Sequence, residues 1–391
     1  MCKVSKSELL GALGIYSAGG LFWAFLPFFV GLKMSLGGMS ESQAGGLGSA
    51  YLMGFTLISL VAMWWAPRFD WRKVSLVAFV LAILILWAML TFENYASQFA
   101  LVFVTGACLG SFWVIAYRIF AMTDNPDRSF AVGIVISYSA LALLTFFLGS
   151  YVVPSGGLAA VTVVLTIVLV ALATSAFLLP KGDGSKGGQP DNDARAPAQA
   201  GKADASAAQP VASIILALLG LLVTGLAFAA VWAFAERIGV LSGHDQSLIS
   251  PVISSNLLAS AVGSVASFLI GSTFGRRTPL LIGMALFIGC IFLLTRADIY
   301  WCYAAAIAGL GFFVGFVLPY QMGAIGEADV KGRFVLLISA AQGGGSALGA
   351  FAGGLVFASG GITSLTGLSI GSLALSTVLF IPILFRKRGT K

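Results

Sequence analysis

The chain has 391 residues, of which 59% are hydrophobic and only 9% charged, with a net charge of +7 and one histidine. About a quarter of the residues of an ordinary soluble domain are charged, so the composition excludes a soluble globular protein. The apolar runs also do not alternate with polar residues as the strands of a membrane barrel would. One histidine leaves little from which to build a metal site or an enzyme. We predict an all-α membrane protein that needs no cofactor and no metal.

Apolar runs of about 20 residues recur along the chain, and each can cross a hydrocarbon core ~30 Å thick. The first run follows Lys3 and Lys6 as a signal peptide would. It is too long for one and lacks a small-residue cleavage site, so we interpret it as a retained first helix. We predict twelve transmembrane helices, at residues 9–32, 44–66, 73–92, 97–122, 129–152, 157–179, 211–241, 247–271, 277–295, 299–322, 333–357 and 361–385.

Lysine and arginine residues predict the orientation, because cytoplasmic loops are enriched in them. If the N-terminus is cytoplasmic, 18 of the 22 lysines and arginines fall on the cytoplasmic side, and only Lys33 and Arg296 fall on the other. We therefore predict a multi-pass protein of the cell inner (plasma) membrane with both termini in the cytoplasm. The positive charge then reflects topology and contact with anionic membrane lipids, and no nucleic-acid partner is expected.

A polar segment rich in Gly, Ala, Asp and Pro divides the spans six plus six. We predict an N-terminal six-helix bundle (1–180), a flexible cytoplasmic linker (181–210) and a C-terminal six-helix bundle (211–391). The two halves align in several places. Trp23 matches Trp232, Phe25 matches Phe234, Tyr117 matches Tyr320, and Arg72–Lys73 matches Arg276–Arg277. Two related, pseudo-symmetric bundles are typical of a transporter whose site lies near the midplane between them.

The six-plus-six plan and the basic loops after spans two and eight resemble the major facilitator superfamily over essentially the full chain. The loop "APRFDWRKV" (66–74) is similar to the family signature Gly-x-x-x-Asp-Arg-x-Gly-Arg-Arg/Lys, but has Ala66 for the Gly and is two residues short. "NPDRSFAVG" (125–133) is similar to the family's motif after span four. The resemblance implies that Asp70 and Arg128 are gating residues, which help to hold the outward-open state. Ordinary loop charge explains the neighbouring basic residues equally well.

Three ionisable residues lie within spans, where such residues are costly and usually functional. Glu236 and Arg237 lie in the outer part of span seven, among apolar residues. A partly desolvated carboxyl that is exposed to each side in turn can couple transport to protons, so we predict that Glu236 is the proton-coupling residue. Arg237 is a candidate for substrate contact. Alternatively, the two residues form a surface pair that caps the helix end. Neighbours on a helix point about 100° apart, so the two side chains cannot both face one point.

Arg118 lies in span four, whose other residues include no carboxylate. A buried guanidinium binds carboxylate or phosphate well, so Arg118 is a candidate substrate-binding residue. Alternatively, it extends to the cytoplasmic surface or pairs with Asp124. The three interior groups together carry a net positive charge, which favours an anionic substrate.

Uncharged polar and aromatic residues complete the predicted substrate-binding site. The candidates are Tyr117, Tyr138, Trp232, Asn256, Tyr320, Gln321 and Gln342, and aromatic rings among them could stack on a substrate. For any single aromatic residue, helix packing or lipid contact explains its presence equally simply. The glycine-rich run 342–354 is interpreted as helix packing and not as a phosphate loop.

We predict a secondary active transporter that works by alternating access and takes up a small organic anion, including aromatic ones, with protons. The alternative is a proton-antiporting exporter of hydrophobic compounds or drugs. Many antiporters of the family carry Gly-Pro-x-x-Gly-Gly in span five, and this chain has no such motif there. The expected partners are the small-molecule substrate, protons and membrane lipids, and a monomer is expected.

Overall fold

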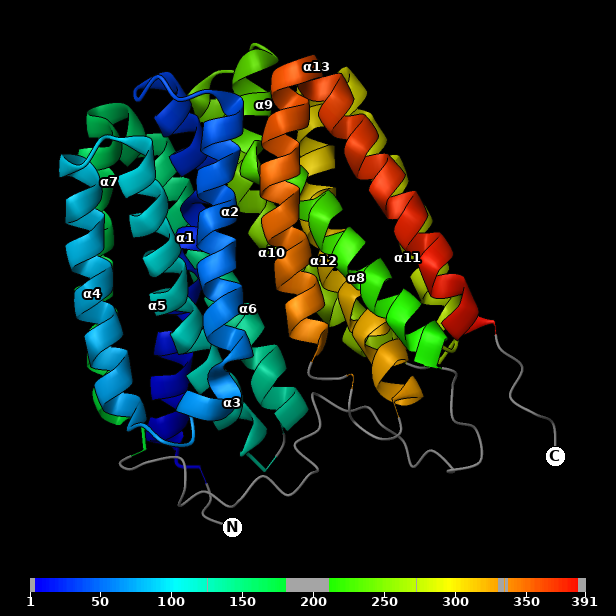
Figure 1. Ribbon diagram of the computed structural model, residues 1–391, viewed down its shortest axis with the longest axis horizontal. Coiled ribbons are helices and arrows are strands. Elements are labelled where there is room, and N and C mark those ends of the chain that lie inside the picture. The colour runs from blue at the N-terminus through cyan, green and yellow to red at the C-terminus, as the bar shows by residue number, and fades with distance from the viewer. Residues whose placement is uncertain are drawn as a thin grey trace.

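The computed structural model describes residues 4–124, 126–180, 211–271, 273–329, 334 and 337–385, and these form helices and their connections (Figure 1). The predicted linker, residues 181–210, lies outside the described residues. The first group of elements comprises α1 (Lys6–Ser35), α2 (Glu41–Leu60), α3 (Ala62–Trp65), α4 (Trp71–Thr91), α5 (Tyr95–Ala121), α6 (Pro126–Phe147), η1 (Leu148–Val152), α7 (Val153–Ala173) and η2 (Thr174–Leu178). The second comprises α8 (Val211–Ala233), α9 (Ala235–Leu241), α10 (Gln246–Ile270), α11 (Arg277–Phe292), η3 (Leu293–Arg296), α12 (Tyr300–Ala328) and α13 (Leu337–Leu384).

Several helices begin at a short polar side chain that satisfies free backbone N–H groups of the first turn. Ser40 caps α2 in a capping box with Gln43. Asp70 caps α4, and Asn94 caps α5. The connections between successive spans are short, so neighbouring spans run antiparallel.

Within the described residues, nine helical stretches are long and apolar enough to cross a membrane. Two of them, of 51 and 48 residues, are each long enough for two spans. Both stretches leave helical geometry at a glycine pair, Gly156–Gly157 and Gly360–Gly361, whose second member has positive φ and therefore needs glycine. With α2, which is 20 residues long, the arrangement is consistent with the twelve predicted spans.

The two groups of helices repeat the same structure about 205 residues apart. Arg72 Nε donates to the carbonyl oxygen of Leu179 at 2.5 Å, and Arg277 Nε donates to that of Leu384 at 3.1 Å. The positive-φ glycines that follow α1 and α9 also differ by 205, at Gly38 and Gly243. This offset corrects all four pairs of the sequence alignment, since by it Phe25 corresponds to Ala230 and Tyr117 to Met322. Arg72 corresponds to Arg277 and not to Arg276, and Trp23 corresponds to Phe228 and not to Trp232.

The two halves meet along three sets of helices: α2 with α13, α6 with α10, and α1 with α8 and α9. Figure 1 shows α2 and α13 side by side between the blue-to-green and green-to-red halves. We call the end of the molecule where α1 begins the Lys6 end, and the end where α1 finishes the Gly31 end.

Candidate functional site

Aromatic residues of α1, α5 and α6 form a cluster toward the Lys6 end of the molecule. The ring of Tyr16 on α1 lies 5.2 Å from that of Trp113 and 5.6 Å from that of Tyr117, both on α5. Trp113 Nε1 donates to the carbonyl oxygen of Tyr16 at 3.1 Å, and Tyr138 on α6 is close enough to interact electrostatically with both tyrosines. Gly19, one turn after Tyr16, leaves the space that the Trp113 ring occupies. The rings are therefore held in fixed positions.

This cluster lies on the face of α1 that is turned toward the other half. Tyr16 precedes Trp23 by seven residues, which places both on one side of a helix. The Trp23 ring stacks on that of Phe228 at 5.7 Å, on α8 of the C-terminal half. Tyr117 is 39% exposed, although three rings surround it, and α5 is not among the helices that hold the halves together. The Tyr117 ring therefore remains accessible beside the interface.

Arg118 follows Tyr117 in the last full turn of α5 and is half-buried. Among the described residues we find no hydrogen bond or ion pair to its guanidinium, so the alternative pairing with Asp124 is not observed; Asp124 has an interaction of its own. A half-buried guanidinium in the residue after Tyr117 is suited to bind a carboxylate near the aromatic cluster.

Trp232 closes the space between the halves in the middle of the molecule. Its side chain is fully buried, and its Nε1 donates to the carbonyl oxygen of Trp23 at 3.2 Å. Its ring also lies 6.0 Å from that of Trp23. Trp232 therefore lies between the aromatic cluster and the Gly31 end. In this conformation it would block the path of a solute from the cluster toward the Gly31 end.

Glu236 lies at the contact between the halves near the Gly31 end. The helix of span seven is interrupted at Phe234, and α9 starts again at Ala235. The Glu236 carboxylate lies against Gly31 of α1, so closely that a Cβ on Gly31 would collide with it. Arg237 is half-buried, and its Nε is a buried donor without a partner among the described residues.

Three of the predicted site residues lie inside the C-terminal half. Asn256 Nδ2 donates to the carbonyl oxygen of Ile307 at 2.8 Å, and the Tyr320 hydroxyl donates to that of Ser267 at 3.4 Å. Gln321 is fully buried, and its Nε2 donates to the Thr224 hydroxyl at 2.9 Å. In this conformation these groups join α8, α10 and α12 to one another and do not face the aromatic cluster.

Gln342 and the two predicted gating residues lie elsewhere. Gln342 is half-buried on α13, beside Gly343, which packs on Thr56 of α2 across the interface. The Asp70 carboxylate accepts from the backbone N–H groups of Arg72 and Lys73 and so caps α4. Arg128 is exposed and has an interaction of its own.

Sequence reasoning did not single out Tyr16 or Tyr303. The seven-residue spacing of Tyr16 and Trp23 was a usable signal for Tyr16. Tyr303 gave no such signal, because its contacts are with α9 and with the loop before α10, both distant in sequence. Among the described residues there is no group of three or more His, Cys, Asp or Glu side chains that could hold a metal ion.

Comparisons with known proteins bear on the family and the fold. The family model of the Major Facilitator Superfamily matches residues 9–328. Among solved structures, a mutant form of the nucleoside transporter NupG matches with a TM-score of 0.67 at 14% identity, covering 97% of this chain and 100% of that one. NupG itself matches with a TM-score of 0.64 at 13% identity, covering 98% and 100%. No curated protein matches in sequence. At these identities the solved structures show the fold alone, whereas the family model covers most of the chain. The chain belongs to the Major Facilitator Superfamily and is a multi-pass membrane transporter, not an enzyme.

Proposed function

We propose that this transporter takes up a small organic anion that carries a planar ring, together with a proton, by alternating access. The observation that carries the substrate class is Arg118, whose half-buried guanidinium has no partner among the described residues and which follows Tyr117 of the aromatic cluster. A carboxylate bound to Arg118 would lie near the aromatic cluster, where the rings of Tyr117, Tyr16 and Trp113 can stack on the attached ring. Tyr138 and Gln342 complete the proposed site from α6 and α13.

Glu236 supports proton coupling, because its surroundings must change during the cycle. In the present conformation Glu236 is half-buried, and its carboxylate lies against Gly31 of α1. Opening the Gly31 end separates α1 from α9 and exposes the carboxylate to water. A charged carboxylate is stable in water, whereas enclosure of an ion is costly, so closure of this end would be coupled to protonation. Arg237 stays beside it as a second candidate contact for the anion.

The proposed orientation follows from the distribution of lysine and arginine residues between the two ends. The Lys6 end carries Arg68, Arg72, Lys73, Arg128, Arg276 and Arg277, and the Gly31 end carries Lys33 and Arg296. We therefore assign the Lys6 end to the cytoplasm of a cell inner (plasma) membrane, with the described conformation closed toward the outside. We retain residues 1–180 and 211–391 as the two moving bundles, residues 181–210 as their linker, Asp70 and Arg128 as gating residues, and a monomer as the working unit. Trp232 would reach substrate once the halves separate. Asn256, Tyr320 and Gln321 stay candidates, and would first have to leave their bonds within the C-terminal half.

An uncharged ring-bearing solute is the second candidate. The two similar solved structures are described as a nucleoside transporter, and an aromatic cluster suits a nucleobase as well as an aromatic acid. Purified protein in liposomes can separate these possibilities with three probes: benzoate, adenosine and ethidium. Uptake of benzoate supports the proposal, uptake of adenosine alone supports the second candidate, and export of ethidium with inward proton movement supports a drug exporter.

The Glu236→Gln variant tests coupling with whichever probe is transported. We expect loss of accumulation driven by an imposed pH gradient, while exchange of labelled for unlabelled probe continues, because exchange needs no net proton movement. Glu93→Gln is the matched control, since Glu93 is exposed at the same end. Accumulation by the Glu236→Gln variant at the level of the parent would refute the assignment of the proton to Glu236.

A further inference from the structure

Tyr303 of α12 is a fully buried side chain that no part of the proposed substrate site uses. Its hydroxyl donates to the carbonyl oxygen of Ala235 at 2.9 Å, within the first turn of α9. The same hydroxyl lies against Gly239, so closely that a Cβ there would meet it at 2.8 Å. Tyr303 therefore contacts the short helix that carries Glu236 at two positions one turn apart, and the Glu236 carboxylate is near enough to interact with it electrostatically.

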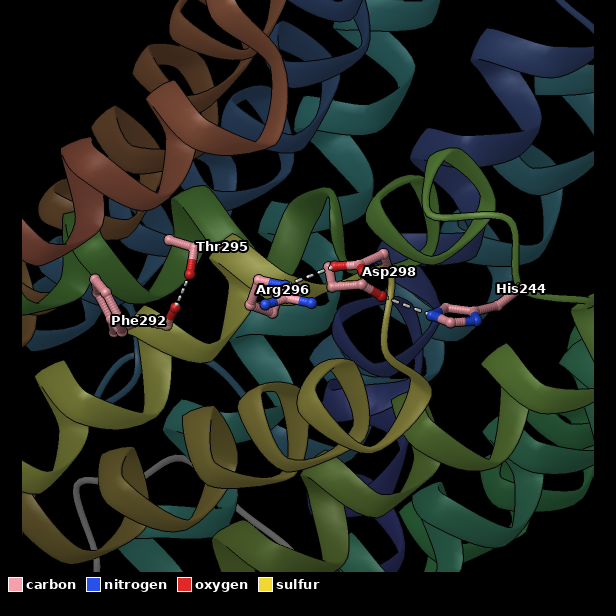
Figure 2. Close-up of polar contacts among 6 residues, drawn as sticks. His244, Phe292, Thr295, Arg296 and Asp298 are labelled. Atoms are coloured by element: carbon pink, nitrogen blue, oxygen red, sulfur yellow. Dashed lines mark hydrogen bonds and ion pairs between the residues drawn. The ribbon is translucent and has the colours of Figure 1, made fainter.

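The other side of the Tyr303 ring is supported by His244, in the loop between α9 and α10. The two rings stack with centroids 5.4 Å apart and 26° between their planes. His244 Nε2 is 2.7 Å from the carbonyl oxygen of Ala297, to which it donates in the matching tautomer. Figure 2 shows His244 directed toward the turn that contains Arg296 and Asp298, an ion pair at 3.4 Å. Tyr303 is thus held from the loop side as well as from α9.

The support from Tyr303 matters because span seven is interrupted just before α9. The backbone of Phe234 is not helical, so α9 is not held rigidly in line with α8. A helix of seven residues has little stability of its own, and its position depends on the residues packed around it. Among the described residues, the fully buried hydroxyl of Tyr303 is the side-chain group that donates a hydrogen bond to the α9 backbone.

This link is not a feature that both halves require. The position 205 residues before Tyr303 is Gln98, which is also fully buried. Its Nε2 donates to the carbonyl oxygens of Met89 and Phe92, at the end of α4, and not to the end of α1. In the N-terminal half, α1 continues unbroken to Ser35 and needs no such support. The hydrogen bond to the first helix of the half therefore occurs where that helix is broken and carries a carboxylate.

We infer that Tyr303 is a positioning residue for transport: its hydroxyl and the His244 ring behind it hold α9 so that Glu236 meets Gly31 when the Gly31 end is closed. The inference rests on the proposed role of Glu236 for its effect on coupling, but not for its effect on the position of α9. Loss of the hydroxyl should free α9 and favour opening of the Gly31 end.

The test is the Tyr303→Phe variant, which removes the hydroxyl and keeps the ring. Spin labels go on Leu36→Cys and Leu248→Cys, which are exposed at the Gly31 end in opposite halves, with the four natural cysteines replaced. We expect the ratio of long to short label distances to rise about three- to tenfold, since a buried hydrogen bond contributes about 1 kcal/mol. Tyr300→Phe is the matched control, because Tyr300 also contacts the His244 ring but forms no hydrogen bond to α9 among the described residues.

A second measurement separates positioning from packing and from the proposed function. In proteoliposomes the pH profile of uptake should shift in the Tyr303→Phe variant, and should not shift further when that substitution is added to Glu236→Gln. If Glu236→Gln alone leaves accumulation intact, the coupling proposal fails, yet the label distances still test the position of α9. If Tyr303→Phe keeps the distances and pH profile of the parent, Tyr303 is a packing residue and the inference is overturned.

Discussion

In the proposed function, Arg118 is the side chain that recognises the anionic group of the substrate. A planar guanidinium can bind a carboxylate through two parallel hydrogen bonds, and a lysine cannot reproduce that geometry. Its position directly after Tyr117 brings charge recognition and ring stacking together in adjacent residues of one helix. The neighbouring rings are also packed too closely to move independently, so an incoming ring would meet a preformed surface.

The Arg118→Lys variant is therefore expected to weaken binding while leaving the fold unchanged. Charge-assisted hydrogen bonds contribute about 1.5–3 kcal/mol, and loss of part of this corresponds to about a tenfold rise in the KM for benzoate uptake. The control is Arg68→Lys, because Arg68 is exposed in the loop before α4. An unchanged KM in the Arg118→Lys variant, with normal Tm, would remove bidentate anion recognition from the proposal.

At the scale of single helices, the boundaries of the spans were predictable and the directions of their side chains were not. The predicted division between residues 357 and 361 falls at the Gly360–Gly361 kink of α13. Apolar runs and glycine pairs mark such ends directly. By contrast, Asn256 and Gln321 were predicted to face the substrate, whereas here both face neighbouring helices of their own half. A membrane helix is apolar on every side, so its sequence pattern does not show which side faces the interface.

The repeat was likewise predictable as a plan and not in register. The sequence alignment paired Trp23 with Trp232, four residues away from the structural offset of 205. Aromatic residues are frequent in this chain, so a local match between two of them is weak evidence. The break at Phe234 had no warning either, since neither proline nor glycine occupies that position. Such details depend on contacts between helices that are distant in sequence.

The repeated arginines lead to a prediction about how the last helix of each half is held. Arg277 donates to the carbonyl oxygen of Leu384 through both Nε and Nη2, and its guanidinium lies 4.2 Å from the Phe385 ring centroid. Free carbonyl groups at a helix end gain from a cation there. We expect Arg277→Ala and Arg72→Ala each to lower stability by about 1 kcal/mol, seen as a lower Tm in detergent.

The control for this pair is Arg68→Ala, which removes an exposed arginine from the same end of the molecule. The two variants should have similar effects because they remove corresponding contacts. A Tm equal to that of the parent in both variants would mean that the ends of η2 and α13 are held by apolar packing alone.

At the scale of the whole molecule, the Gly31 end is closed by three contacts in which a glycine of the N-terminal half meets the C-terminal half. Gly31 meets Glu236, Gly45 meets Ala350 and Gly354, and Gly149 meets Ser250. Two bundles that must separate and rejoin need close contacts without interlocked side chains, and a glycine on one side of each contact provides them. Closure at this end therefore depends on the absence of side chains there.

Gly45→Ala is expected to favour the conformation that is open at the Gly31 end. A Cβ at Gly45 would meet the Ala350 carbonyl oxygen at 2.6 Å and the Gly354 Cα at 2.9 Å, and backbone atoms cannot turn aside. Overpacking of this kind costs about 1–3 kcal/mol, enough to change the ratio of two states about five- to hundredfold.

Gly48→Ala is the control on the same helix, because a Cβ there meets its nearest atom at an ordinary 3.4 Å. Alanine also favours helix over glycine, so α2 itself should not unfold in either variant. Labels on Leu36→Cys and Leu248→Cys should report longer distances for Gly45→Ala and parental ones for Gly48→Ala. Parental distances in both variants would show that the halves close at the Gly31 end without the α2–α13 contact.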